Sequence, residues 1–256
     1  MTYMLNYPRF LSLVCAFAMW GLAWFGAWLR ARFETKASEV KENLGIVVSA
    51  TLTLLGLIIG FTFSMATSRY DQRRLFEEQE ANAIGTEYVR ATLLPEAEGL
   101  ETRKLLKVYL NERIQFYQTE YGTRLGKVDE ETALMQAKLW RSIEPQAVAQ
   151  PNPVTALIVS GMNDVLNSQG YTQFAWWNRI PGSAWTLMIA IALFSNGLVG
   201  YATQRSRFAN LLLLALPLIV SISFFLIADI DSPREGMIRI PPRDLQSLSK
   251  SLGTMP

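Results

Sequence analysis

The sequence contains no histidine and only one cysteine, Cys15, in 256 residues. The lack of histidine excludes Ser-His and Cys-His nucleophile pairs, histidine-ligated zinc and histidine proton shuttles. One cysteine cannot form an intrachain disulfide or a cysteine cluster. The patterns GxxxxGK[ST], GxGxxG and GxSxG are also missing. An enzyme would need carboxylate or metal chemistry, for which no cluster is present, so we expect neither enzymatic activity nor a cofactor.

Charge is also scarce, because Asp, Glu, Lys and Arg make up 18% of the chain and four long runs have none. A helix rises about 1.5 Å per residue, so about 20 residues cross a hydrocarbon core. Each run is at least that long, and no span holds the charged group that ion-coupled transporters usually need. We predict transmembrane helices at about 10–29, 44–68, 183–204 and 208–228.

Residues 69–179, between the second and third spans, have the composition of a folded polar domain. They contain 13 Lys and Arg against 15 Asp and Glu, a balance that argues against nucleic-acid binding. No proline occurs from residue 44 to 94, and Arg73 and Arg74 each precede a glutamate by four residues. Such pairs stabilise an exposed helix. The second span is therefore predicted to continue as a long stalk helix.

Apolar spacing predicts more helices at 100–121, 130–143 and 153 to about 168. We expect Asp129 to cap the second of these and Pro145 to end it. Residues 174–179 carry the aromatic and basic side chains of a membrane interface. The predicted fold is all-α. It has spans in 1–68 and 180–228, a helical extramembrane bundle at 69–179, and a C-terminal tail at 229–256 in which Leu245, Leu248 and Leu252 line a short amphipathic helix.

Seven small or hydroxyl-bearing residues follow each other at steps of three or four in the second span, so they share one helix face. They are Gly45, Ser49, Thr53, Gly56, Gly60, Ser64 and Thr67. Two interpretations stay open: close helix packing, which small residues permit, and a pore face, because hydroxyl groups can line water without charge. Ile59 and Phe63 lie on another face, where they could form an apolar constriction.

Other polar residues near the spans also have alternative interpretations. Asn196 is the strongest polar group within a span, and we expect it to form an interhelical hydrogen bond. Asp229 and Asp231 follow the fourth span at a spacing that suits a shared cation; a solvated turn is the alternative. Glu80 lies in an alanine-rich part of the stalk. We expect it to be partly buried and paired with an arginine rather than catalytic.

Three motifs link the chain to a family. They are GFTFS and SRYDQRR within 60–74, EANAIG at 80–85, and ADIDSP followed by glycine within 228–236. Over about 44–245 the chain resembles the bacterial membrane proteins called bestrophin-like, and more remotely the bestrophin anion channels. That resemblance implies four-span pentamers around a pore lined by the second span. The exit turn with Asp229, Asp231, Pro233 and Gly236 is only loosely similar, and the acidic run that binds calcium in animal bestrophins is missing.

Two functions fit these observations. The first is a homo-oligomeric channel for small inorganic ions, anions by resemblance. The second is a membrane-anchored scaffold whose helical domain binds a partner and whose spans only mediate assembly. In both, the expected partners are the lipid bilayer and further copies of the chain.

The location follows from charge and span number. Four spans place both termini and the 69–179 domain on one side of a bacterial inner membrane. The short loops 30–43 and 205–207 are rich in Arg and Lys, which favours a cytoplasmic position for them and an outward-facing domain. Arg69, Arg73 and Arg74 beside the second span favour the opposite orientation, as does the cytosolic domain of bestrophins.

Overall fold

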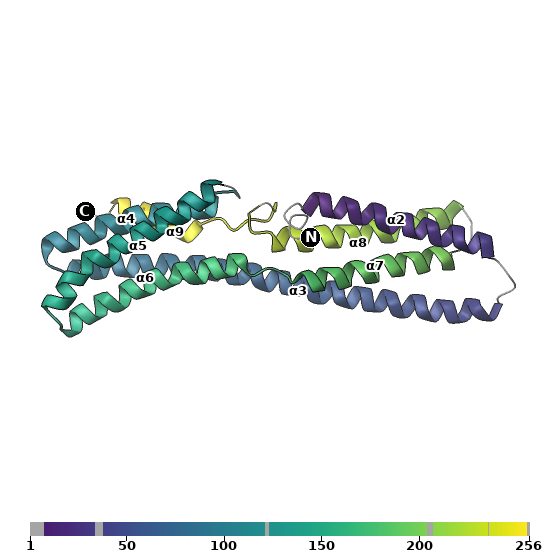
Figure 1. Ribbon diagram of the computed structural model, residues 1–256, viewed down its shortest axis with the longest axis horizontal. Coiled ribbons are helices and arrows are strands. Elements are labelled where there is room, and N and C mark those ends of the chain that lie inside the picture. Colours follow the sequence, from purple (N-terminus) through teal and green to yellow (C-terminus); the bar gives the residue numbers. More distant parts are fainter. Residues whose placement is uncertain (1–7, 34–37, 121–122, 204–206, 235, 255–256) are drawn as a thin grey trace. The chain divides into compact units, whose positions relative to one another are not determined.

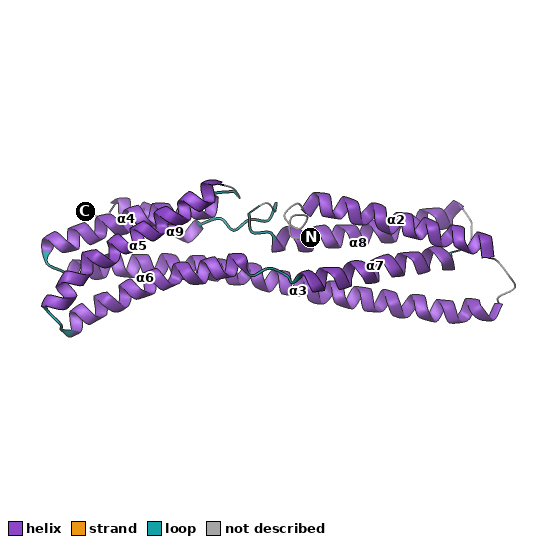
Figure 2. Cartoon of the chain, in the orientation of Figure 1, coloured by secondary structure: helices purple, strands orange, loops and turns teal. Residues whose placement is uncertain are grey.

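The computed structural model describes residues 8–33, 38–120, 123–203, 207–234 and 236–254. Within these ranges every regular element is a helix, which confirms the predicted all-α class (Figure 2). The chain divides into two compact units, each described by itself. The membrane unit contains Met1–Ser68 and Arg179–Ile238, and the helical unit contains Arg69–Asn178 and Arg239–Pro256.

Four helical segments are long and apolar enough to cross a membrane, as predicted. Three of them are α2 (Pro8–Phe33), α7 (Gly182–Ala202) and α8 (Arg207–Asp231), and the fourth lies in α3 (Ser38–Arg90). Helix α2 packs against α7 and α8 (Figure 1). Between α7 and α8, the rings of Trp185 and Phe224 meet edge to face with centroids 6.1 Å apart.

Glycines allow α2 and α7 to approach closely. A Cβ atom on Gly200 would overlap the carbonyl oxygen of Ala23, and one on Gly26 would overlap the carbonyl oxygen of Gly197. Only residues without a side chain permit this backbone contact, which is a common device for packing helices in lipid. At the other end of the bundle, the Ser221 hydroxyl in α8 donates to the carbonyl of Ser12 at 2.7 Å.

Helix α3 is continuous from the second span into the stalk, as predicted, and it begins at Ser38 rather than 44. A short 3-10 turn, η1 (Ala91–Leu93), follows, and Pro95 prevents further extension because proline disfavours helical geometry in the preceding residue. Gly85 does not interrupt α3. A Cβ there would lie 3.0 Å from the Leu248 side chain, so the small residue makes room for the C-terminal helix.

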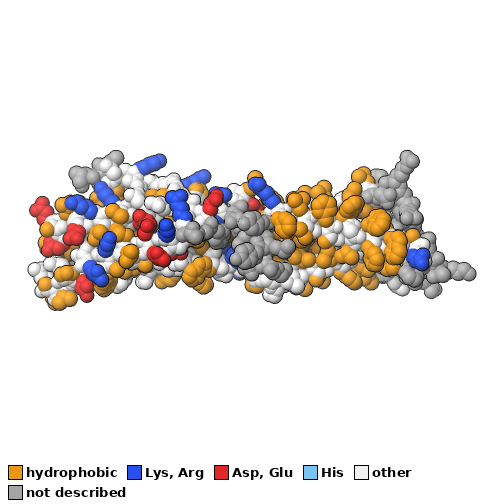
Figure 3. Space-filling model, turned by 45° about the horizontal axis from the view of Figure 1, so that its top comes forward, with side chains coloured by type: hydrophobic (Ala, Val, Ile, Leu, Met, Phe, Trp, Pro, Cys, Tyr) orange, Lys and Arg blue, Asp and Glu red, His pale blue; other side chains and the backbone are white. Residues whose placement is uncertain are grey.

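The helical unit packs α4 (Glu96–Gln118), α5 (Thr123–Ala149), α6 (Pro153–Trp177) and α9 (Arg243–Thr254) around the stalk part of α3. Helix α4 contacts α5 and α9, and α5 contacts α6. Burying each large apolar side chain of this core stabilises the fold by about 1.5–3 kcal/mol. The fully buried members include Ile84, Leu106, Leu110, Leu139, Ile143 and Ile158. Figure 3 shows charged side chains over this unit and mainly hydrophobic ones over the membrane unit.

Several predicted helix boundaries are wrong. Helix α4 starts at Glu96 rather than 100, with two glutamates in its first turn that favour a helix N-terminus. Helix α5 is described from Thr123 to Ala149, so Asp129 is not its cap and Pro145 does not end it. Pro145 is exposed and lies one turn before the end, where little is lost.

Helix α6 also exceeds its prediction and runs to Trp177, so most of the predicted interface segment is its last turn. The predicted tail at 229–256 is divided between the two units. Its helix α9 carries Leu245 and Leu252 in the core, which confirms the predicted amphipathic helix.

Candidate pore face and buried polar sites

The small-residue face of the second span points away from the rest of its own chain. Six of its seven residues are exposed, and Thr67 is half-buried. A Cβ atom on Gly45, Gly56 or Gly60 would meet no atom of the described chain within 4 Å. Packing within one chain therefore does not explain this face, and whatever covers it comes from outside the chain.

The span packs within its own chain through a different face. Leu55, Thr62 and Ala66 are buried there, at steps of seven and four residues. Even so, only 6% of the most apolar stretch of α3 is buried, against 28% for α2 and 44% for α8. The second span is thus the least covered of these spans in a single chain.

The threonine hydroxyls of the small-residue face donate to carbonyls of their own helix. Thr53 donates to the Ser49 carbonyl at 2.8 Å, and Thr67 donates to the Phe63 carbonyl at 3.0 Å. Their oxygen lone pairs remain able to accept hydrogen bonds from water. Thr51 makes the same kind of bond, to Val47 at 3.0 Å, but it lies close to the packed face.

The predicted apolar residues Ile59 and Phe63 flank this face. Ile59 is half-buried and lies near the packed side, whereas Phe63 is 40% exposed. Each directly precedes a residue of the small-residue face in the sequence. Its side chain therefore lies about a quarter turn around the helix from that face. Of the two, Phe63 is the one placed to reach beyond its own chain.

Among the described residues, Asn196 does not form the interhelical hydrogen bond that we expected of it. Asn196 is buried, and its amide donates to the Ala192 carbonyl of the same helix at 2.7 Å. A side-chain amide within the hydrocarbon needs a hydrogen-bond acceptor because no water is available. The backbone carbonyl one turn earlier in the same helix is close enough to serve. Within the apolar part of the bundle, Ser221 forms an interhelical bond instead, although it is a weaker polar group that the sequence did not single out.

Asp229 and Asp231 are buried, so the alternative of a solvated turn is wrong. Asp229 accepts N–H bonds from Met237 at 2.7 Å and Ile238 at 2.9 Å. Asp231 accepts the N–H of Ile180 at 3.1 Å and lies 3.5 Å from the Arg179 guanidinium. The two carboxylates thus hold different segments of the membrane unit. The described residues contain no group of three or more metal-ligating side chains.

An ion pair lies at the centre of the helical unit. Arg113 of α4 donates from Nε to Glu80 of α3, and both side chains are fully buried. The hydroxyls of Thr172 and Tyr117 donate to the other carboxylate oxygen at 3.0 and 3.3 Å. The Arg113 guanidinium also lies over the Phe116 ring, 4.4 Å from its centroid. The predicted pairing of Glu80 with an arginine is confirmed, and its burial is complete.

Two further glutamates of α3 are buried in the same unit. Glu77 accepts the N–H groups of Asp244 and Leu245 at 3.0 Å each and so caps α9 from another helix. Burial raises the pKa of Glu77 to about 7, although the Leu245 N–H opposes this. The position of α9 therefore depends on a group far away in the sequence.

Glu87 has no hydrogen-bond partner for either carboxylate oxygen among the described residues. A Cβ on Gly161 of α6 would overlap its Oε2 atom, so the glycine provides the space for this carboxyl group. Burial raises the pKa of Glu87 to about 8, with the charge of Arg90 opposing and that of Asp164 adding to the shift. Near neutral pH the protonated form is favoured.

The sequence contains a signal for the α2–α7 contact that none of the predictions above includes. Gly197 and Gly200 stand three residues apart in one span, and Ala23 and Gly26 do so in another. Small residues about one turn apart on a helix face let two helix backbones approach closely in a membrane.

These observations define a class: an all-helical membrane protein with four spans, whose second span carries a small-residue face that its own chain leaves uncovered. The family model of the Bestrophin-like domain matches residues 17–245. The chain therefore belongs to the Bestrophin-like family, and the match includes most of the first span, which the three motifs did not cover. A comparison with curated proteins gave no match.

Solved structures show the same fold. A bacterial bestrophin homolog from Klebsiella pneumoniae has a TM-score of 0.63 at 15% identity, covering 96% of this chain and 99% of that chain. A variant of that homolog with one mutation has a TM-score of 0.65 at 13% identity, covering 94% of each chain. At these identities the likeness establishes the architecture of the chain.

Proposed function

We propose that the protein is a homo-oligomeric channel for small inorganic ions, with the second spans of several copies around a central path. The observation that carries this proposal is the uncovered face of α3. A Cβ atom added at Gly56 or Gly60 would meet no atom of the described chain within 4 Å. A helix that met only lipid would have no use for a row of small residues, since Leu and Ile contact lipid equally well. Small hydroxyl-bearing side chains suit close contact with water or with a second copy.

The ion class rests on resemblance. Bestrophins are anion channels that form pentamers, and we propose the same selectivity and, by resemblance only, the same number of subunits here. Phe63 would supply an apolar constriction on the path, with Ile59 one turn earlier on the side that faces its own chain. Asp229 and Asp231 remain proposed cation ligands, although their present N–H bonds would have to be exchanged for metal contacts.

Ion flux through proteoliposomes tests the channel directly. Thr53→Val preserves the shape of the side chain but removes its hydroxyl group, and it should reduce chloride flux several-fold while leaving the oligomer intact. Thr51→Val is the matched control, since it removes an equivalent hydroxyl near the packed face. Gly56→Leu should block flux or reduce the oligomer. Absent chloride flux in the unaltered protein, together with a monomeric mass in mild detergent, would reject the channel.

The alternative is a membrane-anchored scaffold, in which the same face only joins copies. The observation that favours it is the large helical unit, whose exposed surface is rich in charge (Figure 3). In that case Thr53→Val and Thr51→Val would leave the protein equally unchanged, and Gly56→Leu would reduce the oligomer size. An intact oligomer without flux would therefore select the scaffold.

We propose a bacterial inner membrane location with the helical unit outside, since the short basic loops favour the cytoplasm. Impermeant thiol labelling of spheroplasts tests this in a Cys15→Ser background. Glu120→Cys, on the exposed surface of the helical unit, should be labelled, and Ser38→Cys, at the start of α3, should be protected. The reverse pattern would place the helical unit in the cytoplasm.

A further inference from the structure

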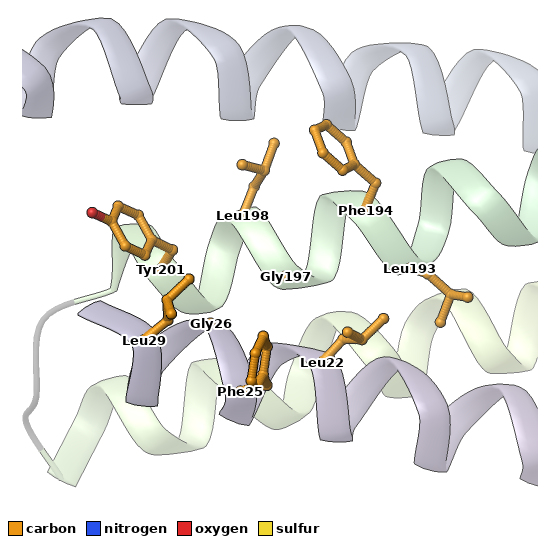
Figure 4. Close-up of a pocket in the computed structure, with 9 residues that line it drawn as sticks. All are labelled: Leu22, Phe25, Gly26, Leu29, Leu193, Phe194, Gly197, Leu198 and Tyr201. Carbon is orange, nitrogen blue, oxygen red and sulfur yellow. The ribbon is translucent and has the colours of Figure 1, made fainter. Parts of the chain in front are cut away.

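An apolar groove runs between α2 and α7 on the membrane unit (Figure 4). Its volume is about 440 Å³. Gly26 and Gly197 lie at its floor, where the two helices touch, and Phe25, Leu198 and Phe194 are among the side chains along it. Both helices belong to candidate spans, so the groove lies at the depth of the hydrocarbon, and Figure 4 shows Phe194 and Leu198 pointing towards the neighbouring helix α3.

The size of the groove suits a single hydrocarbon chain. An apolar cavity of about 150 Å³ takes one six-carbon benzene ring, so a groove of this size accommodates roughly 18 carbon atoms. That is the length of one acyl chain of a membrane lipid.

One end of the groove is polar and basic. Tyr201 and Leu29 line this end, and Figure 4 shows the Tyr201 hydroxyl there. Arg30 follows Leu29 directly, and its guanidinium donates to the Ala202 carbonyl at 2.7 Å, which holds it at the end of α7. Arg32 is exposed in the same last turn of α2. Neither α2 nor α7 contains an acidic residue.

We propose that this groove binds one acyl chain of an anionic phospholipid, whose phosphate lies beside Arg30 and Arg32. The apolar walls provide the affinity for the chain, and the two positive charges favour a headgroup with net negative charge. This site is independent of ion conduction, because it lies on α2 and α7 rather than on the face of α3.

Native mass spectrometry of the detergent-solubilised full chain tests the proposal, with dioleoyl phosphatidylglycerol and dioleoyl phosphatidylcholine as probes. The unaltered protein should retain one phosphatidylglycerol per chain in preference to phosphatidylcholine. Leu198→Trp fills the groove and should abolish retention. Leu187→Trp, which adds the same ring at an exposed position of α7 outside the groove, should not.

The charged end is tested by Arg30→Gln combined with Arg32→Gln. Each basic residue at an anionic lipid surface raises the binding affinity about fivefold. Removing both charges should therefore weaken the binding of phosphatidylglycerol about thirtyfold. Arg9→Gln, an exposed charge at the opposite end of α2, is the control and should have little effect. Equal retention of both lipids by the unaltered protein would overturn the proposal. So would equal effects of a test variant and its control, either Leu198→Trp and Leu187→Trp or the double arginine variant and Arg9→Gln.

A photoactivatable phosphatidylglycerol provides a readout that does not depend on any variant folding. With the diazirine near the end of its acyl chain, the cross-linked peptides should contain residues 22–29 or 193–201. Cross-links confined to other segments would overturn the site. The proposal would also be overturned if Leu198→Trp reduced the number of subunits in the oligomer and Leu187→Trp did not. That result would show that side chains of a second copy fill the groove.

Discussion

The buried pair of Glu80 and Arg113 allows a sharp test of what stabilises the helical unit. Arg113→Met keeps much of the side-chain volume and removes the charge. Glu80 would then lie fully buried with only the hydroxyls of Thr172 and Tyr117 as donors. Leaving one partner of a buried pair uncompensated destabilises a fold by about 3–5 kcal/mol. For a unit of this size, that corresponds to a fall in Tm of about 10–20 °C.

Thermal unfolding of the full chain in detergent, followed by circular dichroism and tryptophan fluorescence, measures this effect. The double variant Glu80→Gln with Arg113→Met removes both charges of this pair and should recover at least half of the loss. The control is Glu120→Gln, which removes the ion pair of Glu120 with Arg239 at the exposed surface and should change little. The reasoning fails if Arg113→Met resembles this control, or if the double variant is as unstable as the single one.

Two further predictions concern pH and helix contact. The pKa values of Glu87 and Glu77 are raised to about 8 and 7, so the folded unit binds protons more tightly than the unfolded chain. Its stability should therefore be highest in mild acid and fall as the pH rises from about 5 to 8. In a plot of Tm against pH, Glu87→Gln should flatten the upper part of this fall. Identical curves for the variant and the unaltered protein would contradict the raised pKa of Glu87. In the membrane unit, Gly200→Leu forces α2 from α7 and should abolish recovery of monodisperse protein, whereas Gly21→Leu meets open space and should not. Equal recovery of the two glycine variants would show that the close contact is dispensable.

Features that depend on local pattern could be predicted from the amino-acid sequence. Charge-free runs of sufficient length predict spans because a charge within hydrocarbon is unfavourable wherever the rest of the chain lies. The continuity of α3 also follows from local terms, since neither proline nor a strong capping signal interrupts it. The pairing of Glu80 with an arginine was predictable in kind, because a buried carboxylate needs a compensating charge. Which arginine supplies that charge was not.

Contacts between groups far apart in the sequence could not be predicted in this way, because they depend on how the helices pack. Gly161 is an ordinary helical glycine in the sequence, and its role is apparent only when the Glu87 carboxylate of α3 is placed against it. The same holds for Glu77, which caps a helix more than 160 residues further along the chain. The face of α3 shows the distinction most clearly. Periodicity put its small residues in one row, but whether that row was covered depended on where α2, α7 and α8 packed, because non-local contacts decide burial.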